Sequence, residues 1–132
     1  MKKMLACLLC ALLLLPPFAQ AEAQEIFYSE DFQYQYILLE DGTAEITGYS
    51  GFAESLTVPA EIDGHAVTGI GDRAFSFCFN MAEVTLPDGV TSIGNYAFYG
   101  CGSLTLTVSR DSEAEQYCKE NDLAYTYADG LN

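Results

Sequence analysis

A spacing of 23 residues is the feature that most constrains the fold of this 132-residue chain. The run Ile-Gly-Asp-Arg-Ala-Phe at residues 70–75 returns as Ile-Gly-Asn-Tyr-Ala-Phe at residues 93–98. The third residue after each run is a cysteine, Cys78 or Cys101. A fixed period of this length is typical of repeat proteins, in which each coil buries its apolar side chains against its neighbours. The spacing therefore predicts a solenoid with two full corners.

Short strand patterns separate these corners. Residues 84–87 read Val-Thr-Leu-Pro, and they have counterparts at residues 56–59, Leu-Thr-Val-Pro, and 106–108, Leu-Thr-Val. Alternation of apolar residues with threonine predicts strands with one buried face, and proline then ends the ladder. The phenylalanines that end the two corner runs, Phe75 and Phe98, are predicted to be equivalent buried residues.

The corner run ahead of a Val-Thr-Leu-Pro strand resembles the repeat of the BspA-like leucine-rich-repeat proteins, a group of bacterial surface and secreted proteins. The resemblance spans residues 34–127. It implies a right-handed leucine-rich-repeat solenoid of the α/β class that is rich in strands. It also implies adhesion or protein binding as the role, because catalysis is not what this repeat is known for.

The two corners differ in their later residues. Phe77 and Phe79 crowd the first corner at positions where the second corner has Gly100 and Gly102. The first coil also carries five extra residues ahead of its corner, among them His65, which we expect in a solvated loop.

A short solenoid needs caps because each of its ends is an open apolar face. We expect an N-terminal β-hairpin cap over residues 24–55, coils over residues 56–110, and a C-terminal cap of a helix and a strand over residues 111–132. A small capped domain is expected rather than a fragment.

The hairpin follows from an Asp-Gly pair between two apolar runs, which is a strong turn signal. We expect Ile37 and Leu39 to face Ile46 and Ala44 across this hairpin.

The C-terminal helix follows from the sequence Ser-Glu-Ala-Glu at residues 112–115, which has the pattern of a capping box. The carboxylate of Glu115 is expected to reach back to the backbone N–H of Ser112, and the helix to run to about Asn121. A last strand is expected over residues 123–127.

The first 23 residues have the pattern of a secretory signal peptide. Lys2 and Lys3 precede a 12-residue apolar run that is too short to span a bilayer, and small residues follow it with the spacing that signal peptidase accepts. Cleavage is expected after Ala21 or Ala23, so the mature protein is secreted or otherwise extracytoplasmic, with cell-surface association left open.

Charge excludes several partners. The chain has 19 Asp and Glu against 5 Lys and Arg, a formal net charge of −14. Cleavage after Ala21 would remove both early lysines and make the charge 3 minus 19, or −16. Nucleic acids and anionic membrane surfaces are therefore not expected as partners. No membrane span is expected after signal cleavage, and the mature protein is expected to be a monomer.

No catalytic constellation is visible in the sequence. His65 is the only histidine and follows an Asp-Gly turn, so a solvated turn residue is expected rather than a catalytic base. Glu113 and Glu115 lie two residues apart on a predicted helix and diverge, which argues against a glycosidase pair. We predict no catalytic residue, no metal site and no cofactor.

Three cysteines remain after signal cleavage: Cys78, Cys101 and Cys118. We expect Cys78 and Cys101 to stack in adjacent coils. Their side chains would then run parallel, so both thiols, together with that of Cys118, are expected to stay free.

Two functions are open at this point. The first is a secreted or cell-surface module that binds a protein or a glycan, with adhesion as one form of this role. Its candidate binding face consists of the outward residues of the strands: Thr57, Glu83, Thr85, Thr105 and Thr107. The second is a cell-envelope hydrolase, or an accessory domain of an envelope enzyme complex. The ligand itself cannot be deduced from these residues.

Overall fold

The structure is a computed structural model that describes residues 24–130. The predicted signal peptide, residues 1–23, lies outside the described residues. The elements are β1 (Phe27–Tyr28), β2 (Tyr34–Leu38), β3 (Ala44–Tyr49), β4 (Ser55–Thr57), β5 (Glu61–Ile62), β6 (His65–Ile70), β7 (Glu83–Thr85), β8 (Ser92–Ile93), β9 (Thr105–Val108), α2 (Glu113–Glu120) and β10 (Ala124–Tyr127).

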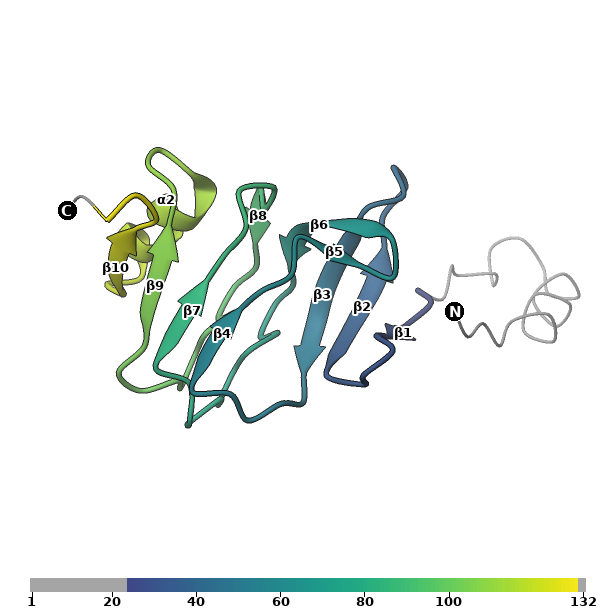
Figure 1. Cartoon of the computed structure of the whole chain (residues 1–132), viewed down its shortest axis with the longest axis horizontal. Coiled ribbons are helices and arrows are strands. Elements are labelled where there is room, and N and C mark those ends of the chain that lie inside the picture. The colour runs from purple at the N-terminus through teal and green to yellow at the C-terminus, as the bar shows by residue number, and fades with distance from the viewer. Residues whose placement is uncertain (1–23, 131–132) are drawn as a thin grey trace, which may run out of the picture.

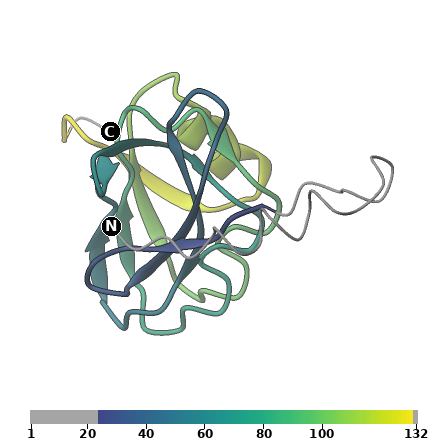
Figure 2. The same ribbon diagram turned by 90° about the vertical axis from the view of Figure 1, so that its right-hand side faces the viewer.

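These strands form two sheets around one interior. The first sheet has the order β1-β2-β3-β6-β5, with β8 also paired to β6, and the second has the order β10-β9-β7-β4. Figure 1 shows the coils side by side along the long axis, and Figure 2 shows them superposed around a common interior. Among residues 24–130, α2 is the only helix. The prediction of a strand-rich solenoid with a C-terminal helix is confirmed.

The two corners pack in register, as the 23-residue spacing predicts. The rings of Phe75 and Phe98 are both buried and stack with centroids 5.2 Å apart and planes 7° from parallel. Close backbone packing explains a glycine in the second corner: a Cβ atom on Gly94 would lie 2.5 Å from the backbone nitrogen of Asp72. Any side chain at Gly94 would therefore force the two coils apart.

The hairpin of β2 and β3 forms where it is predicted, but its facing residues are shifted by one. Tyr36 lies opposite Ile46 and Leu38 opposite Ala44, so the prediction that Ile37 and Leu39 face them is wrong. Two interleaved apolar sets are present in this strand, and the set containing tyrosine is the one that is buried.

A hydrogen bond explains how the tyrosine can be buried. Tyr36 is fully buried, and its hydroxyl donates to Asp63 Oδ2 at 2.6 Å. Its polar end is therefore satisfied while the ring fills the core. Burial, followed by this hydrogen bond, raises the pKa of Tyr36.

The five extra residues of the first coil do not form the expected loop. They contribute to an antiparallel hairpin of β5 and β6, in which Ile62 lies opposite His65. Asp63 and Gly64 form the turn with φ values of 52° and 85°, the pair of left-handed residues that a tight hairpin turn requires. His65 is therefore a strand residue, with its Nδ1 atom 3.0 Å from the carbonyl oxygen of Gly42.

The C-terminal cap begins with the predicted capping residue. The Ser112 hydroxyl accepts a hydrogen bond from the backbone N–H of Glu115 at 3.1 Å. The Glu115 carboxylate accepts from the N–H of Asp111 at 2.7 Å, one residue before the expected Ser112. A hydrogen bond from the Tyr127 hydroxyl, followed by the Asp111 N–H, holds the pKa of Glu115 below its usual value.

The last strand, β10, continues the second sheet. It pairs with β9 in parallel, with Ala124 opposite Thr105 and Tyr127 opposite Val108. The cap thus adds a strand to the same ladder that joins the coils.

Candidate binding surfaces

The second sheet presents one outward surface, which we call the strand face. Val84 and Leu106 point inward and are fully buried, so their neighbours along each strand point outward. Because β4, β7, β9 and β10 are parallel and in register, the outward residues form two rows across the strands. These rows are Ser55, Glu83, Thr105 and Ala124, and Thr57, Thr85, Thr107 and Thr126.

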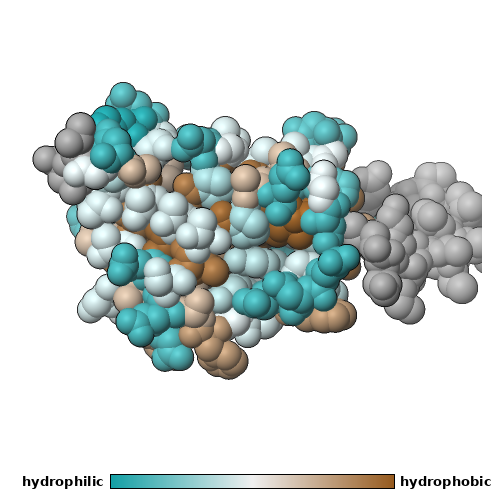
Figure 3. Space-filling model, in the orientation of Figure 1, coloured by the Kyte–Doolittle hydropathy of each residue, from teal (hydrophilic) through white to brown (hydrophobic). Residues whose placement is uncertain are grey.

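All five residues predicted for the binding face lie on this surface. Thr57 and Glu83 are exposed, whereas Thr85, Thr105 and Thr107 are half-buried between neighbouring strands. The surface is pale in Figure 3, so it is neither strongly hydrophilic nor strongly hydrophobic. Short hydroxyl side chains in parallel rows give a flat polar surface that could donate and accept hydrogen bonds.

Sequence reasoning missed one member of the second row, Thr126. Its hydroxyl lies 3.4 Å from that of Thr107. The predicted last strand contained Thr126, but the 23-residue period stops before this strand, and 19 residues separate the two threonines. Parallel alternation within the last two strands was the signal that could have found it.

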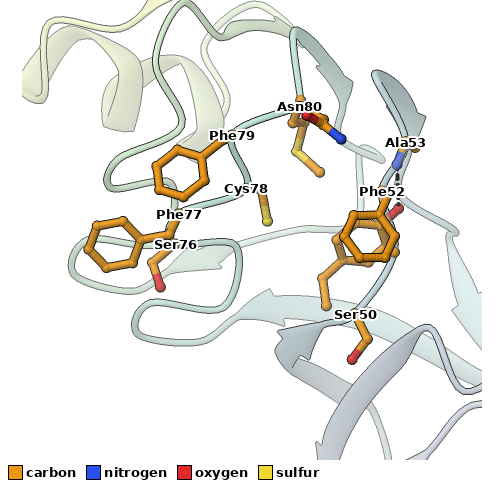
Figure 4. Close-up of a pocket in the computed structure, with 11 residues that line it drawn as sticks. Ser50, Phe52, Ala53, Ser76, Phe77, Cys78, Phe79 and Asn80 are labelled. Atoms are coloured by element: carbon orange, nitrogen blue, oxygen red, sulfur yellow. Dashed lines mark hydrogen bonds between the residues drawn. The ribbon is translucent and has the colours of Figure 1, made fainter.

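A second surface lies where the chain enters β4 and β7. Residues 49–53 and 76–81 enclose a hollow of about 360 Å³, which we call the aromatic hollow. Figure 4 shows Phe52 on one wall and Phe77 and Phe79 across from it, with the Cys78 thiol between them. Phe52 and Phe79 are 85% and 76% exposed. Apolar atoms also lie along the lower edge of the view in Figure 3.

The aromatic side chains continue from this hollow onto the next coil. Phe77 lies 5.9 Å from Phe79 and 5.5 Å from Tyr99 between ring centroids, and Tyr99 lies 5.5 Å from Tyr96. All four of these rings are more than half exposed. Together with Phe52 they form a cluster of exposed aromatic residues on one edge of the solenoid, whereas the strand face carries none.

Phe77 has an unusual backbone. Its φ is 58°, in the left-handed region that favours glycine, and the equivalent position of the second corner is Gly100 with φ 75°. An L-residue pays about 1–2 kcal/mol to adopt this conformation. The Phe77 ring covers Gly100, because a Cβ atom there would lie 2.6 Å from a ring carbon.

The cysteine thiols are free and held in their protonated form. Cys101 and Cys118 are buried and Cys78 is half-buried, and no disulfide joins them. Burial raises the pKa of Cys78 and of Cys118 to about 11 each. The Cys101 thiol donates to the carbonyl oxygen of Phe75 at 3.0 Å. Raised pKa values make these thiols poor nucleophiles at neutral pH.

No group of three or more His, Cys, Asp or Glu side chains that could hold a metal ion is found within residues 24–130. Across the same residues, no helix has the length and apolar character needed to cross a membrane.

A strand-rich solenoid whose parallel strands stack coil on coil defines the class of the protein, which is a repeat protein of the leucine-rich-repeat type. The chain belongs to the family described as "BspA type Leucine rich repeat region (6 copies)", which matches residues 45–118. The resemblance seen in the corner runs is thereby confirmed.

Solved structures of bacterial proteins are similar to this chain. A T. pallidum leucine rich repeat protein is 33% identical with a TM-score of 0.55, over 61% of this chain and 38% of that one. A leucine rich cell surface protein from Faecalibacterium prausnitzii is 31% identical with a TM-score of 0.59, over 84% of this chain and 32% of that one. The chain thus spans less than two-fifths of the length of either relative. No curated protein gives a significant match.

Proposed function

We propose that this protein is a non-catalytic binding module that acts outside the cytoplasm and holds a protein or glycan partner on its strand face. Proteins of the BspA type are often surface-associated, and the F. prausnitzii relative is described as a cell surface protein. The signal-like pattern of residues 1–23 supports export by the same route. Adhesion is one form that this role would take.

The strand face is the observation that carries the proposal. Four parallel strands hold two rows of outward side chains in register, and three adjacent threonine positions form the second row with Thr126. Repeat proteins build extended binding surfaces in this way, because each coil presents the same position at a fixed spacing. The surface is already ordered, so a partner would bind without the cost of ordering a loop.

Charge narrows the class of partner. Glu22, Lys2 and Lys3 precede residue 24, so residues 24–130 hold 18 of the 19 acidic residues and 3 of the 5 basic ones. Those three cations are engaged within the protein: Arg110 lies 3.1 Å from Asp129, Lys119 lies 3.6 Å from Glu115, and Arg73 lies over the Tyr96 ring. A basic or cation-bridged partner would therefore be attracted, and an acidic one repelled.

The test uses the purified protein as bait against the envelope fraction of the producing bacterium and against host matrix proteins. The variant with Thr85→Lys and Thr107→Lys should capture less partner, because it adds two positive charges to the strand face. A matched control with Glu30→Gln and Glu61→Gln changes the net charge by the same amount at exposed residues elsewhere. Capture should also weaken as salt rises through physiological ionic strength, since surface charges are screened beyond about 8 Å there.

Equal capture by all three proteins at every salt concentration would contradict the strand face as the binding surface. The hydrolase alternative is tested separately, by screening glycosidase, esterase and peptidase substrates. Turnover of any of them by the wild-type protein would contradict the non-catalytic assignment. Size-exclusion chromatography with light scattering tests the proposed monomer.

A further inference from the structure

We propose that the aromatic hollow is a docking site for an arginine or lysine side chain of a partner polypeptide, distinct from the strand face. The hollow lies between residues 49–53, which lead into β4, and residues 76–81, which lead into β7. Its volume of about 360 Å³ has room for a long side chain and part of its backbone. This inference does not require the strand face to bind anything.

The aromatic rings of the hollow do little for the fold. Phe52 is 85% exposed and has no ring partner among the described residues, and Phe79 is 76% exposed and contacts only the ring of Phe77. Exposed aromatic residues grouped around a concavity are characteristic of binding sites, where they supply most of the buried apolar area. The inward rings of the corners, by contrast, are fully used in the core.

Backbone strain points to the same place. Phe77 keeps a left-handed backbone that its counterpart Gly100 adopts freely. A strained residue that forms one wall of a concavity is a reason to infer a function there, because a glycine would satisfy the fold at lower cost. The strain places the Phe77 ring between Phe79 and Tyr99.

The charge around the hollow selects a cation. None of the residues that line it is basic, and none is acidic. Two exposed carboxylates adjoin it in the chain, Glu54 after the first wall and Glu83 after the second. These two segments are joined, because the carbonyl oxygen of Glu54 accepts from the backbone N–H of Glu83 at 3.1 Å. An apolar aromatic hollow beside two carboxylates suits a guanidinium or ammonium group on an aliphatic stem.

The protein already uses the same chemistry internally. The guanidinium of Arg110 lies 3.8 Å from the centroid of the Tyr127 ring, and that of Arg73 lies 5.2 Å from the centroid of the Tyr96 ring. Within residues 24–130, the rings of Phe52 and Phe79 have no such cation over them. A second copy of this chain is a poor occupant because both copies are strongly acidic. A neutral sugar would make no use of the two carboxylates.

Fluorescence anisotropy with three labelled peptides tests this inference at physiological salt. Each peptide has ten residues of glycine and serine except for four positions, which are arginine, citrulline or glutamate. Citrulline has nearly the shape of arginine without its charge. The arginine peptide should bind at least about tenfold more tightly than the citrulline peptide, and the glutamate peptide should not bind.

Protein variants locate the site. The double variant Phe52→Ala and Phe79→Ala should weaken binding of the arginine peptide by about tenfold or more. Phe32→Ala is the matched control, because it removes a 68% exposed phenylalanine outside the hollow and leaves the net charge unchanged. Glu54→Gln should weaken binding by more than Glu61→Gln, although both remove one exposed carboxylate. Melting curves establish that each variant is folded.

Two results would overturn the inference. If the double variant binds the arginine peptide as tightly as Phe32→Ala does, the peptide is held by the acidic surface in general. If the citrulline peptide binds equally well, the hollow does not select a cation. A loss of binding confined to the variant with Thr85→Lys and Thr107→Lys, relative to Glu30→Gln with Glu61→Gln, would move the peptide to the strand face. That last outcome would contradict this inference and support the proposed function.

Discussion

The two corners of the solenoid have the same interior and different exteriors. Phe75 and Phe98 stack inside the protein at equivalent positions. Two and four residues further along, the first corner has exposed Phe77 and Phe79, whereas the second corner has glycines. The inward position is fixed by packing between coils, because any change there would alter the spacing of both neighbours. The outward positions are free to vary, and this is where the two coils differ.

The difference also shows what a repeat pattern measures. A residue that returns at the period marks a place where coils touch, and a residue that does not return marks a place where only one coil has a use for it. The aromatic hollow belongs to the second kind. Its walls come from segments 76–81 and 49–53, and neither has an aromatic counterpart one period away on both sides.

The largest expected effect is loss of an inward ring. Phe75→Ala and Phe98→Ala should each lower the free energy of unfolding by about 3–5 kcal/mol, because each leaves a cavity in the stacked core. Urea unfolding followed by circular dichroism measures this. The comparison would break if one variant were destabilised and the other were not, since the two positions would then not be equivalent.

A smaller effect is expected at the left-handed positions. Gly100→Ala should destabilise more than Gly102→Ala, although their φ values are nearly equal at 75° and 74°. A Cβ atom on Gly100 meets the Phe77 ring at 2.6 Å, whereas nothing lies within 4 Å of one on Gly102. Gly102→Ala should therefore cost about 1–2 kcal/mol from backbone strain alone.

The additional loss in Gly100→Ala isolates the contact between the corners. Adding Phe77→Ala should recover that additional loss, because the clashing ring is gone. Melting temperatures of the two single variants and the double variant measure the coupling. Independent, additive losses would show that the Phe77 ring does not lie over Gly100.

An outward ring should contribute little to the fold. Phe79→Ala is expected to change the free energy of unfolding by no more than about 0.5 kcal/mol, because the side chain is 76% exposed. Chemical denaturation of this variant beside Phe98→Ala gives the contrast directly. A loss as large as that of Phe98→Ala would mean that the exposed ring is a structural residue, and the case for a docking site would weaken.

The smallest effect concerns charge at the start of each corner. The first corner has Asp72 where the second has Asn95. Burial, followed by the charge of Asp72, raises the pKa of Glu45. A raised pKa means that ionising Glu45 opposes folding, so this unfavourable contribution is absent at low pH and appears as pH rises through the raised pKa.

Asp72→Asn should therefore raise the melting temperature slightly at neutral pH. The gain should vanish on acidification, when Glu45 becomes protonated. The Asn side chain can still accept the hydrogen bond that Asp72 Oδ1 receives from the backbone N–H of Asn95 at 2.8 Å. Melting curves of both proteins across the acidic range measure the difference. A gain that persists at low pH would show that it does not arise from Glu45.

The sequence predicts the interior of this protein better than its edges. The period places Phe75, Phe98 and the strand rows correctly because coils repeat the same contacts. The hairpin of β2 and β3 has no repeat to fix its register. Its strand offers two alternating apolar sets, and the aromatic set is inside because Asp63, from a distant hairpin, satisfies the Tyr36 hydroxyl. No local pattern in β2 reveals that partner.

The same reasoning applies to the candidate surfaces. The outward threonines follow from alternation within each strand, so the strand face could be predicted residue by residue. The individual aromatic residues of the first corner were visible in the sequence as a departure from the repeat. Their convergence with Phe52 was not, because residues 49–53 lie outside the period and come to the corner only through the path of the chain between β3 and β4.

The pairing of β10 with β9 has a consequence for how such a protein can grow. β10 pairs with β9 in the same parallel arrangement by which β9 pairs with β7, so the C-terminal cap recognises the edge of a coil and not a particular coil. A duplicated 23-residue coil inserted ahead of β9 would lengthen the sheet by one strand spacing, about 4.8 Å, while both caps kept their contacts. Length is thus an adjustable property of this architecture. Each added coil would bring another pair of outward positions that could diverge while its inward residues stayed the same.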